Sequence, residues 1–313
     1  MTEDEELLAI RAAELYYDED KTQDEVGAIL GLTRWKVGRL LAQAKARGFI
    51  RIEIVHPRAR RLGIERELRE RYGLTDAVVV PATATGELEG RVAQAAADYL
   101  SSIRPVPRVL GVSWGRTLHA VAGQLAEGWA TGVNVVQING GVSLNRRAGT
   151  AAATAVEIAR KAGGQATLLP SPAILERLET KQSIEADRTV AQVIELGRSA
   201  NVYLYSAGVI GQDSALVDSG YLSRDDMDLL MQRGAVGDVV GRYIDAEGML
   251  VDPSLDERTV GISLDRLRQA TTSIAVIAGD DKQAIARAVV GSGLCTVLVT
   301  DDSIARALLA PER

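Results

Sequence analysis

The sequence predicts a small helical domain at residues 1–56, a connecting helix at 57–75, and an α/β domain with a largely parallel sheet at 76–313. Two observations predict this division. Before residue 50, apolar side chains recur mainly at helical spacing, and glycines end the helical segments. From residue 76 onward, uninterrupted apolar runs of strand length alternate with helical segments, as in parallel sheets that are buried on both faces.

The helical domain is built around two short helices joined by a tight turn, within residues 22–48. Thr22 and Glu25 have the spacing of a capping box, Gly31-Leu32 forms the turn, and Thr33 is placed to cap the second helix. The apolar residues of the second helix follow the spacing i, i+3, i+4, i+7, which predicts one buried face: Val37, Leu40, Leu41 and Ala44. Two helices about such a turn are typical of a helix-turn-helix.

Neighbouring segments complete this domain. A further helix is expected over residues 5–17, with apolar positions at Leu8, Ala12 and Leu15. The expected apolar face of the first helix of the pair consists of Val26, Ile29 and Leu30. Residues 49–55 alternate apolar and charged side chains, so a short strand is expected there, which would make the domain a winged helix-turn-helix.

Basic residues are concentrated in and after the second helix. The whole chain has a formal net charge of -6, but residues 31–61 contain nine Lys or Arg (34, 36, 39, 45, 47, 51, 58, 60 and 61) against one acid, Glu53. Such a local cationic surface favours double-stranded DNA through counterion release, and a helix fits the major groove. The alternative is an amphipathic hairpin with a solvated basic face. The candidate DNA-binding residues are Gln23, Thr33, Arg34, Trp35, Lys36 and Arg39.

The α/β domain is predicted from its alternating elements. Strands are expected at 76–81, 108–112, 134–138, 166–170, 201–208, 273–279 and 296–300. Helices are expected at 86–103, 118–127, 149–163, 183–197 and 281–290, with a last short helix at the C-terminus. In sheets of this kind ligands bind beyond the carboxyl ends of the strands, so the loops that follow strands are the candidate sites.

One such loop, GVSWGRTL at 111–118, carries several groups that can hold a ligand. Ser113, Gly115 and Thr117 stand with Arg116 at a strand-to-helix turn, where free backbone amides favour anions or polar oxygens. The spacing is neither that of a Walker A motif nor GxGxxG.

Further glycine-rich loops follow other strands. They are INGGV at 138–142, LLPSPAIL at 168–175 and SAGVIGQ at 206–212. Asp238 and Asp245 lie in the glycine-punctuated segment 234–248, and Lys282 lies in AGDDKQAI at 278–285. Each loop alone can be an ordinary tight turn. Together they predict a pocket for a polyol, sugar or sugar phosphate, with carboxylates for hydroxyls and cations for an anionic end.

The composition excludes several kinds of site. Cys295 is the only cysteine, so an internal disulfide is excluded; a buried structural thiol and a reducing cytoplasm are expected. With only His56 and His119 besides, the sequence predicts no metal site, no Ser-His-Asp triad, no catalytic residues and no cofactor. The acidic N-terminus gives no sign of a signal peptide, and no apolar stretch could span a bilayer, so a cytoplasmic protein without membrane partners is expected.

These stretches resemble the SorC-type sugar-binding transcriptional regulators over nearly the whole chain. The resemblance is carried by residues 22–52, GVSWGRTL, INGGV, LLPSPA, SGYLS at 219–223, GAVGDVVGRYIDAEG, VGISLDRLR at 260–268, AGDDKQAI and LVTDDSIA at 298–305. It implies a regulator, usually a homotetramer built as a dimer of dimers, that binds operator DNA of sugar or polyol catabolic genes. It also implies a C-terminal domain similar to sugar-phosphate isomerases and deaminases that senses a sugar, polyol or sugar-phosphate effector.

The resemblance extends to the residues that would contact the effector. They are Ser113, Gly115, Arg116, Thr117, Gly140, Gly141, Asp245 and Lys282, with Trp114 and Asn139 in the same loops. Trp114 can either stack on a sugar face or pack against the next helix. Many members of the family have AGG before the lysine, whereas this chain has Ala278-Gly279-Asp280. The additional acid weakens the expectation of a phosphorylated effector.

Two other functions remain open at this point. The chain can be a sugar-phosphate isomerase or deaminase with an accessory N-terminal domain, because Asp245 and Lys282 are able to exchange protons. No compact acid–base pair supports that alternative. The chain can also be a DNA-binding protein without a ligand, if the glycine-rich loops are only structural.

Overall fold

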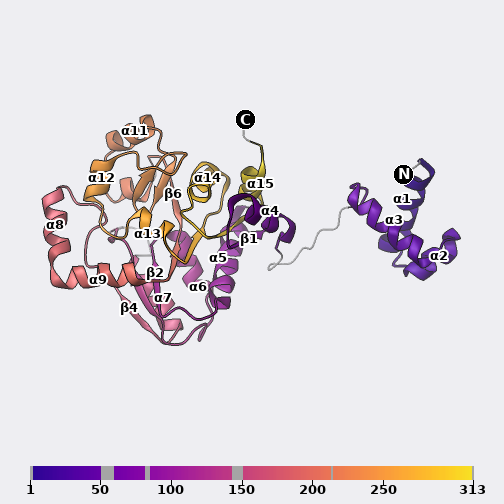
Figure 1. Cartoon of the computed structure of the whole chain (residues 1–313), viewed down its shortest axis with the longest axis horizontal. Coiled ribbons are helices and arrows are strands. Elements are labelled where there is room, and N and C mark those ends of the chain that lie inside the picture. The colour runs from indigo at the N-terminus through magenta and orange to yellow at the C-terminus, as the bar shows by residue number, and fades with distance from the viewer. Residues whose placement is uncertain (1–2, 51–59, 82–84, 143–150, 213, 312–313) are drawn as a thin grey trace. The chain divides into compact units, whose positions relative to one another are not determined.

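The computed structural model describes residues 3–50, 60–81, 85–142, 151–212 and 214–311. The chain divides into two compact units, Met1–His56 and Pro57–Arg313 (Figure 1). Among the described helices, none is both long enough and apolar enough to cross a membrane.

The described residues of the first unit form helices and turns. The helices are α1 (Glu3–Ala13), a π-helical turn (Glu14–Asp18), α2 (Gln23–Leu30) and α3 (Arg34–Ala46). The strand predicted at 49–55 falls mainly on residues 51–59, which lie outside the described residues.

Local capping sets the ends of α2 and α3, as the sequence predicts. Thr22 and Glu25 form the capping box of α2, and Gly31 ends that helix with φ 68°, a left-handed conformation that favours glycine. The Thr33 hydroxyl accepts a hydrogen bond from the Lys36 amide and caps α3. A Cβ atom on Gly27 would lie 2.7 Å from the Leu32 carbonyl oxygen, so the turn can approach α2 only at a glycine.

The core of the first unit is centred on the predicted face of α3. Its four residues are buried, as predicted: Val37, Leu40, Leu41 and Ala44. They pack with Ala9, Ala12, Leu15 and Val26 from the preceding helices. The prediction for α2 was wrong at Ile29, which is 55% exposed. Only Val26 and Gly27 of α2 are buried, because this helix of eight residues places few side chains against the rest of the unit.

The second unit is organised on a seven-stranded sheet in the spatial order β1-β10-β9-β5-β2-β3-β4. Its strands are β1 (Asp76–Val80), β2 (Val109–Val112), β3 (Asn134–Gln137), β4 (Gln165–Thr167), β5 (Val202–Tyr205), β9 (Thr272–Val276) and β10 (Val297–Asp301). Every pairing within this sheet is parallel. The predicted parallel sheet is therefore confirmed.

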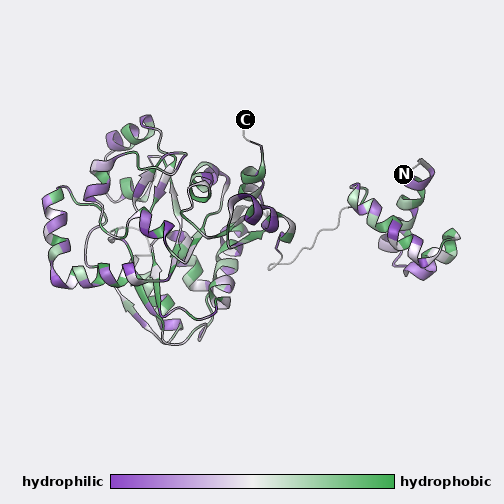
Figure 2. Ribbon diagram, viewed as in Figure 1, coloured by the Kyte–Doolittle hydropathy of each residue, from purple (hydrophilic) through white to green (hydrophobic). Residues whose placement is uncertain are grey.

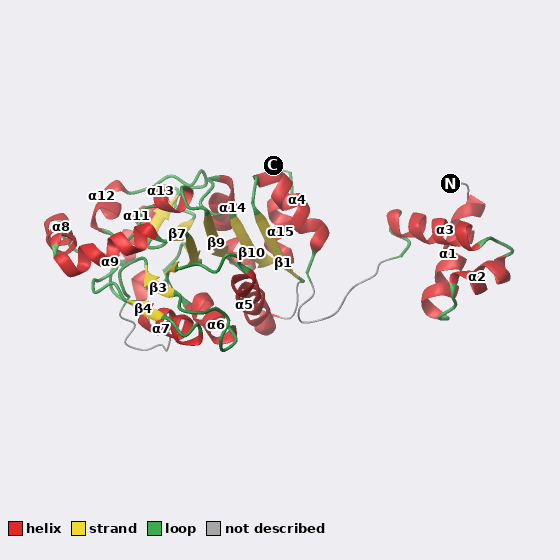
Figure 3. Cartoon of the chain, turned by 60° about the horizontal axis from the view of Figure 1, so that its bottom comes forward, coloured by secondary structure: helices red, strands yellow, loops and turns green. Residues whose placement is uncertain are grey.

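Helices cover both faces of the sheet. They are α4 (Leu62–Tyr72), α5 (Thr85–Ser102), α6 (Arg116–Gln124), α7 (Ala151–Lys161), α9 (Arg188–Ser199), α14 (Gln283–Gly291) and α15 (Asp302–Leu309). Helix α8 (Leu178–Ala186) packs on α9, and the 3-10 turn η2 (Asp280–Lys282) precedes α14. In Figure 3, α5, α6 and α7 lie on one side of the strands, and α4, α14 and α15 lie on the other.

Burial on both faces follows from the alternation of side chains along each strand. In β1, Ala77 and Val79 join the hydrophobic cluster that contains α4, α9, α14 and α15. Val78 and Val80 join the cluster that contains α5, α6 and α7. The helices carry hydrophilic residues alongside these apolar ones (Figure 2). The predicted structural thiol, Cys295, is buried, and burial raises its pKa to about 12.

Helix α4, predicted as a connecting helix, is part of the second unit. Leu68 is fully buried in the sheet cluster. The buried Glu65 carboxylate accepts two hydrogen bonds from Arg60 at 2.8 Å and one from the Val79 amide at 2.9 Å. Because these contacts tie α4 to β1, the helix is held on the sheet.

The chain between β5 and β9 forms a layer that the strand pattern did not predict. It contains a three-stranded antiparallel sheet in the order β6 (Ala207–Val209), β7 (Gly237–Val239) and β8 (Arg242–Ile244). Its helices are α10 (Ala215–Asp218), α11 (Arg224–Gln232), α12 (Pro253–Arg258) and α13 (Leu264–Arg268). These strands have three residues each, too few to show a clear alternation.

Candidate functional site

A cavity of about 500 Å³ lies where four neighbouring strands of the parallel sheet end. Residues that follow β9, β5, β2 and β3 line it, and these strands are adjacent in the sheet. The remaining walls come from the start of α5, from α10 and from the β6–β7 pair. Ligands in parallel α/β sheets bind at this edge, so the cavity is the candidate ligand site of the second unit.

The N-terminus of α6 forms one wall of the cavity. Ser113 to Thr117 line it, and Gly115 takes a φ of 138°, a conformation that few other residues adopt. No side chain among the described residues caps α6 at this end. The free amides of the first turn therefore remain available to an anion or to the oxygens of a sugar.

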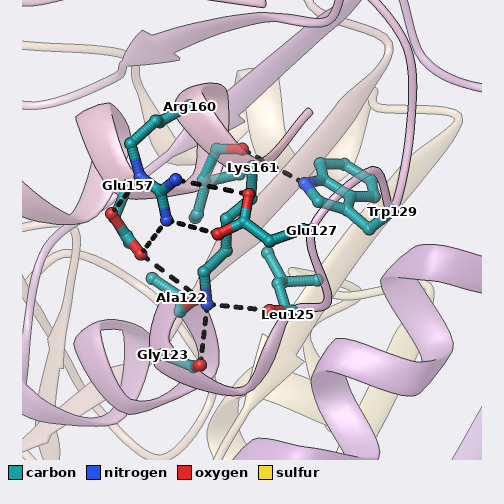
Figure 4. Close-up of polar contacts among 9 residues, drawn as sticks. Ala122, Gly123, Leu125, Glu127, Trp129, Glu157, Arg160 and Lys161 are labelled. Carbon is teal, nitrogen blue, oxygen red and sulfur yellow. Dashed lines mark hydrogen bonds and ion pairs between the residues drawn. The ribbon is translucent and has the colours of Figure 1, made fainter. Parts of the chain in front are cut away.

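The opposite end of α6 is fixed by a buried lysine (Figure 4). Lys161 donates hydrogen bonds to the carbonyl oxygens of Ala122, Gly123 and Leu125, at 2.9, 2.8 and 2.7 Å. A cation at a helix C-terminus donates hydrogen bonds to the last carbonyl groups and interacts favourably with the negative end of the helix dipole. Helix α6 is thus anchored at one end and presents its free end to the cavity.

Two neutral polar atoms of the cavity wall have no hydrogen-bond partner among the described residues. Asn139 is 1% exposed, and its Oδ1 atom has no partner among the described residues. The same holds for Oγ of Ser206, which also lines the cavity. Since buried polar atoms are rarely left unpaired, these two atoms indicate a hydrogen-bonding ligand or water in the cavity.

Asp238 and Lys282 bring opposite charges to the same cavity. The Asp238 carboxylate accepts a hydrogen bond from the Gly241 amide at 3.0 Å. Burial raises the pKa of Asp238 to about 6, although the Gly241 hydrogen bond and the charge of Lys282 both act to lower it. Burial also lowers the pKa of Lys282, and the Lys282 ammonium group forms no hydrogen bond or ion pair within the described part of the chain. Contacts between a ligand and these two side chains would offset the free energy that desolvation of their charges costs.

A close contact with β6 positions Asp238. A Cβ atom on Gly208 would lie 2.0 Å from Oδ1 of Asp238, so the carboxylate occupies the space that a side chain would need. In the register of the antiparallel strands β6 and β7, Gly208 lies directly opposite Asp238. The pairing of β6 with β7 thus places the Asp238 carboxylate in the wall of the cavity.

The structure brings most of the predicted effector-binding residues together. The predicted residues that line the cavity are Ser113, Trp114, Gly115, Arg116, Thr117, Asn139 and Lys282. Trp114 is half-buried, and its Nε1 atom donates a hydrogen bond to the Gly140 carbonyl oxygen at 2.9 Å. Its indole is thus held in the wall of the cavity.

Gly140 and Gly141 are not among the lining residues; they form the support behind Trp114. A Cβ atom on Gly140 would lie 2.1 Å from the Pro172 carbonyl oxygen, which explains the glycine by close backbone packing. Gly141 exchanges backbone hydrogen bonds with Ser171 and Ala173 at 2.8 and 3.0 Å.

The expected contact between Asp245 and the effector requires correction. Asp245 lies outside the cavity lining, and its carboxylate accepts hydrogen bonds from the amides of Glu247 and Met249 at 3.0 and 2.8 Å. This is an Asx-type turn, and the glycine at Gly248 is its signal in the sequence. Asp238, in the same glycine-punctuated segment, does line the cavity, as do Glu89, Asp218, Asp280 and Asp281. The residue packed against it, Gly208, is distant in sequence and gives no local pattern.

In the first unit, the predicted DNA-binding residues lie on and around α3. Arg34, Trp35, Lys36 and Arg39 are exposed. The predicted Thr33 is exposed too, although its hydroxyl is engaged in capping. Arg34 lies 3.6 Å from Asp24 of α2, in an exposed ion pair that contributes little stability.

Gln23, also predicted to contact DNA, is partly buried at the start of α2. A Cβ atom on Gly38 would lie 3.2 Å from Oε1 of Gln23. The glycine in α3 therefore accommodates the Gln23 side chain.

No group of three metal-binding side chains occurs among the residues that the structure describes. Lys282 and Asp238 are the groups of the cavity with shifted pKa values.

Comparisons with known proteins concern the whole chain. Residues 56–310 match the sequence model of a family described as "Putative sugar-binding domain". The chain is 31% identical over 311 residues to the deoxyribonucleoside regulator of Bacillus subtilis (strain 168), covering 99% of both proteins. It is 29% identical over 317 residues to the erythritol catabolism regulatory protein EryD of Brucella abortus (strain 2308), covering 99% of this chain and 98% of EryD.

A solved structure agrees with these sequence relatives. The crystal structure of the full-length sorbitol operon regulator SorC from Klebsiella pneumoniae matches with a TM-score of 0.73 and 26% identity. The match covers 98% of this chain and 100% of that chain.

Proposed function

The chain belongs to the SorC-type family of sugar-binding transcriptional regulators, and from this premise we propose that it binds operator DNA through its helical unit under the control of a carbohydrate-derived effector. The observation that carries the proposal is the cavity of the second unit. It combines unpaired neutral polar atoms, a free helix N-terminus and an opposed acid and cation. The relatives of this chain are named as regulators and not as enzymes.

The helical unit supports the DNA-binding part of the proposal. Helices α2 and α3 enclose the short turn that ends in the Thr33 cap, and two short helices about such a turn support a helix-turn-helix. We assign α3 as the helix that enters the major groove, with the basic residues Arg34, Lys36 and Arg39 exposed on it. The strand predicted at 49–55 would supply the wing.

The cavity supports an effector with several hydroxyl groups. A hydroxyl can donate to Oδ1 of Asn139 or to the Asp238 carboxylate, and Ser206 can donate or accept. Lys282 and the α6 amides suit an anionic end, such as a phosphate or carboxylate. Trp114 offers an apolar surface for a sugar face. Sugars, polyols and sugar phosphates are the ligand class that uses all of these groups.

The proposal extends to two features of architecture. The parallel sheet with a ligand at its carboxyl edge is the arrangement expected for a domain similar to sugar-phosphate isomerases and deaminases. A homotetramer built as a dimer of dimers would place pairs of helical units on palindromic operator DNA. The effector would then act by binding the DNA-competent and incompetent arrangements with different affinities.

A thermal-shift screen of the full chain against sugars, polyols and their phosphates tests the effector half of the proposal. A ligand at a hundredfold excess over its Kd is expected to add about 2.7 kcal/mol of stability. Lys282→Ala should weaken the response, whereas Arg39→Ala should preserve it and lower DNA binding. Equal loss of both activities in either variant would contradict the assignment of one function to each unit.

A further inference from the structure

Trp35 has the highest exposed fraction of any large apolar side chain among the described residues, 85%. It is the second residue of α3, two positions after the Thr33 cap. An indole exposes a large apolar surface that gains stability only when it is removed from water. Nothing in the described helical unit covers it, so its placement is not explained by the folding of that unit.

The geometry of α3 puts Trp35 on its outermost line. At about 100° per residue, Trp35 and Arg39 each lie roughly 160° from the buried Val37, on opposite sides. They are therefore about 40° apart around the helix and one turn apart along it. Both point away from the buried stripe that attaches α3 to its unit.

The charges around Trp35 restrict what can cover it. Arg34 and Lys36 flank it in sequence, Arg39 lies one turn further on, and all three are exposed. A partner that buries the indole must also receive these cations, which favours a polyanion over an apolar protein groove. Duplex DNA meets this requirement, because its phosphates border a groove in which base edges are accessible.

We propose that Trp35 is a base-reading residue that contacts the C5-methyl group of a thymine in the major groove. This inference rests on the proposed DNA-binding function and deepens it. The thymine methyl is the apolar group that base pairs display in the major groove, whereas their other edge groups are hydrogen-bond donors and acceptors. The indole Nε1–H can donate to an acceptor beside that methyl, such as O4 or N7. Arg39, one turn along, is placed for a neighbouring guanine.

The test begins with selection of duplexes from a random pool by the full chain, followed by uracil substitution at each selected thymine. Uracil differs from thymine only by lacking the methyl group. At one thymine per half-site, wild-type affinity should fall about fourfold, the factor expected for one buried methyl group. Trp35→Ala should bind the thymine and uracil duplexes equally, and Trp35→Phe should keep part of the difference.

Lys36→Ala is the matched control, since it alters the exposed neighbour of Trp35 on the same turn. It should weaken binding to all duplexes and retain the uracil effect. Wild-type affinity that is insensitive to uracil at every thymine would overturn the inference, as would a uracil effect that persists undiminished in Trp35→Ala. Either result would leave the DNA-binding function standing if a sequence is selected. Failure of the full chain to select any sequence would contradict the proposed function itself, and the inference with it.

Discussion

The two candidate binding regions hold their charged groups in opposite surroundings. On α3, Lys36 and Arg39 are exposed, so their charges remain hydrated and place no burden on the fold. In the cavity, burial raises the pKa of Asp238 and lowers that of Lys282. A charge on a surface needs only a helix to carry it, whereas a charge in a cavity needs contacts that oppose its desolvation. Substitution of the exposed charges on α3 should therefore change DNA binding alone. Substitution of the buried charges in the cavity should change both ligand binding and the stability of the fold.

Glycines show the same difference between the two regions. Gly31 ends α2 with open space around its Cα atom, and only its φ of 68° opposes a side chain. Gly140 supports the cavity wall with the Pro172 backbone 2.1 Å from where a Cβ would be. Gly31 is needed for its left-handed backbone conformation, whereas Gly140 is needed because no side-chain atom fits beside the Pro172 backbone.

The largest expected effect is that of Gly140→Ala. Because the obstructing atom belongs to the backbone, the free energy of unfolding of the second unit should fall by about 3 kcal/mol or more. Gly31→Ala should cost about 1 kcal/mol, the penalty of a left-handed alanine. Urea unfolding of both variants measures the difference. Similar small losses in the two variants would remove the contrast between the regions.

The next effect concerns ligand binding by Lys282 and DNA binding by Lys36. Lys282→Ala should lower ligand affinity about tenfold or more, because it removes a charged hydrogen-bond donor. Lys36→Ala should leave ligand affinity unchanged and reduce the salt dependence of DNA binding by about one phosphate contact. Calorimetric titration and DNA binding at several salt concentrations measure these changes.

Asp245→Ala is the control for the cavity variant. It removes the cap of a turn outside the cavity lining, so it should lower stability slightly and leave ligand affinity intact. If Asp245→Ala weakened the ligand as much as Lys282→Ala did, the assignment of the site to this cavity would fail.

A pH dependence of stability is expected as well. The pKa of Asp238 is raised from 3.8 to about 6 in the folded chain, so the folded state binds this proton more tightly than the unfolded state does. The resulting stabilisation is complete below pH 3.8 and is lost as pH rises to about 6. Asp238→Asn cannot titrate there. Its stability relative to wild type should rise between about pH 4 and 6 and then level off.

Thermal unfolding of both proteins across that range checks the prediction. A difference between them that does not change with pH would indicate that Asp238 is as well hydrated as the surface charges of α3.

Much of the fold follows from local patterns in the sequence. The caps Thr22 and Thr33, the buried stripe of α3 and the parallel strands are set by neighbouring residues or by spacing along one element. The loop that carries Ser113 and Thr117 was found for the same reason, since a ligand site at the end of a parallel strand is a consequence of the sheet.

The features that the sequence left open or predicted wrongly depend on contacts between distant segments. Of the two acids in segment 234–248, Asp238 and not Asp245 enters the cavity because β6 and β7 pair and Gly208 leaves room for it, and neither fact has a local signal. Ile29 has helical spacing with Val26, yet α3 covers only the latter.

The most direct test is the DNA affinity of the full chain with and without a ligand found in the thermal-shift screen. Wild type and Lys282→Ala would be measured on the same selected duplex. We expect saturating ligand to change wild-type affinity by about 5- to 150-fold, the usual range of coupling between sites, and to leave the variant nearly unchanged at the same concentration. Unchanged wild-type affinity, or an equal change in the variant, would contradict control of the helical unit by this cavity.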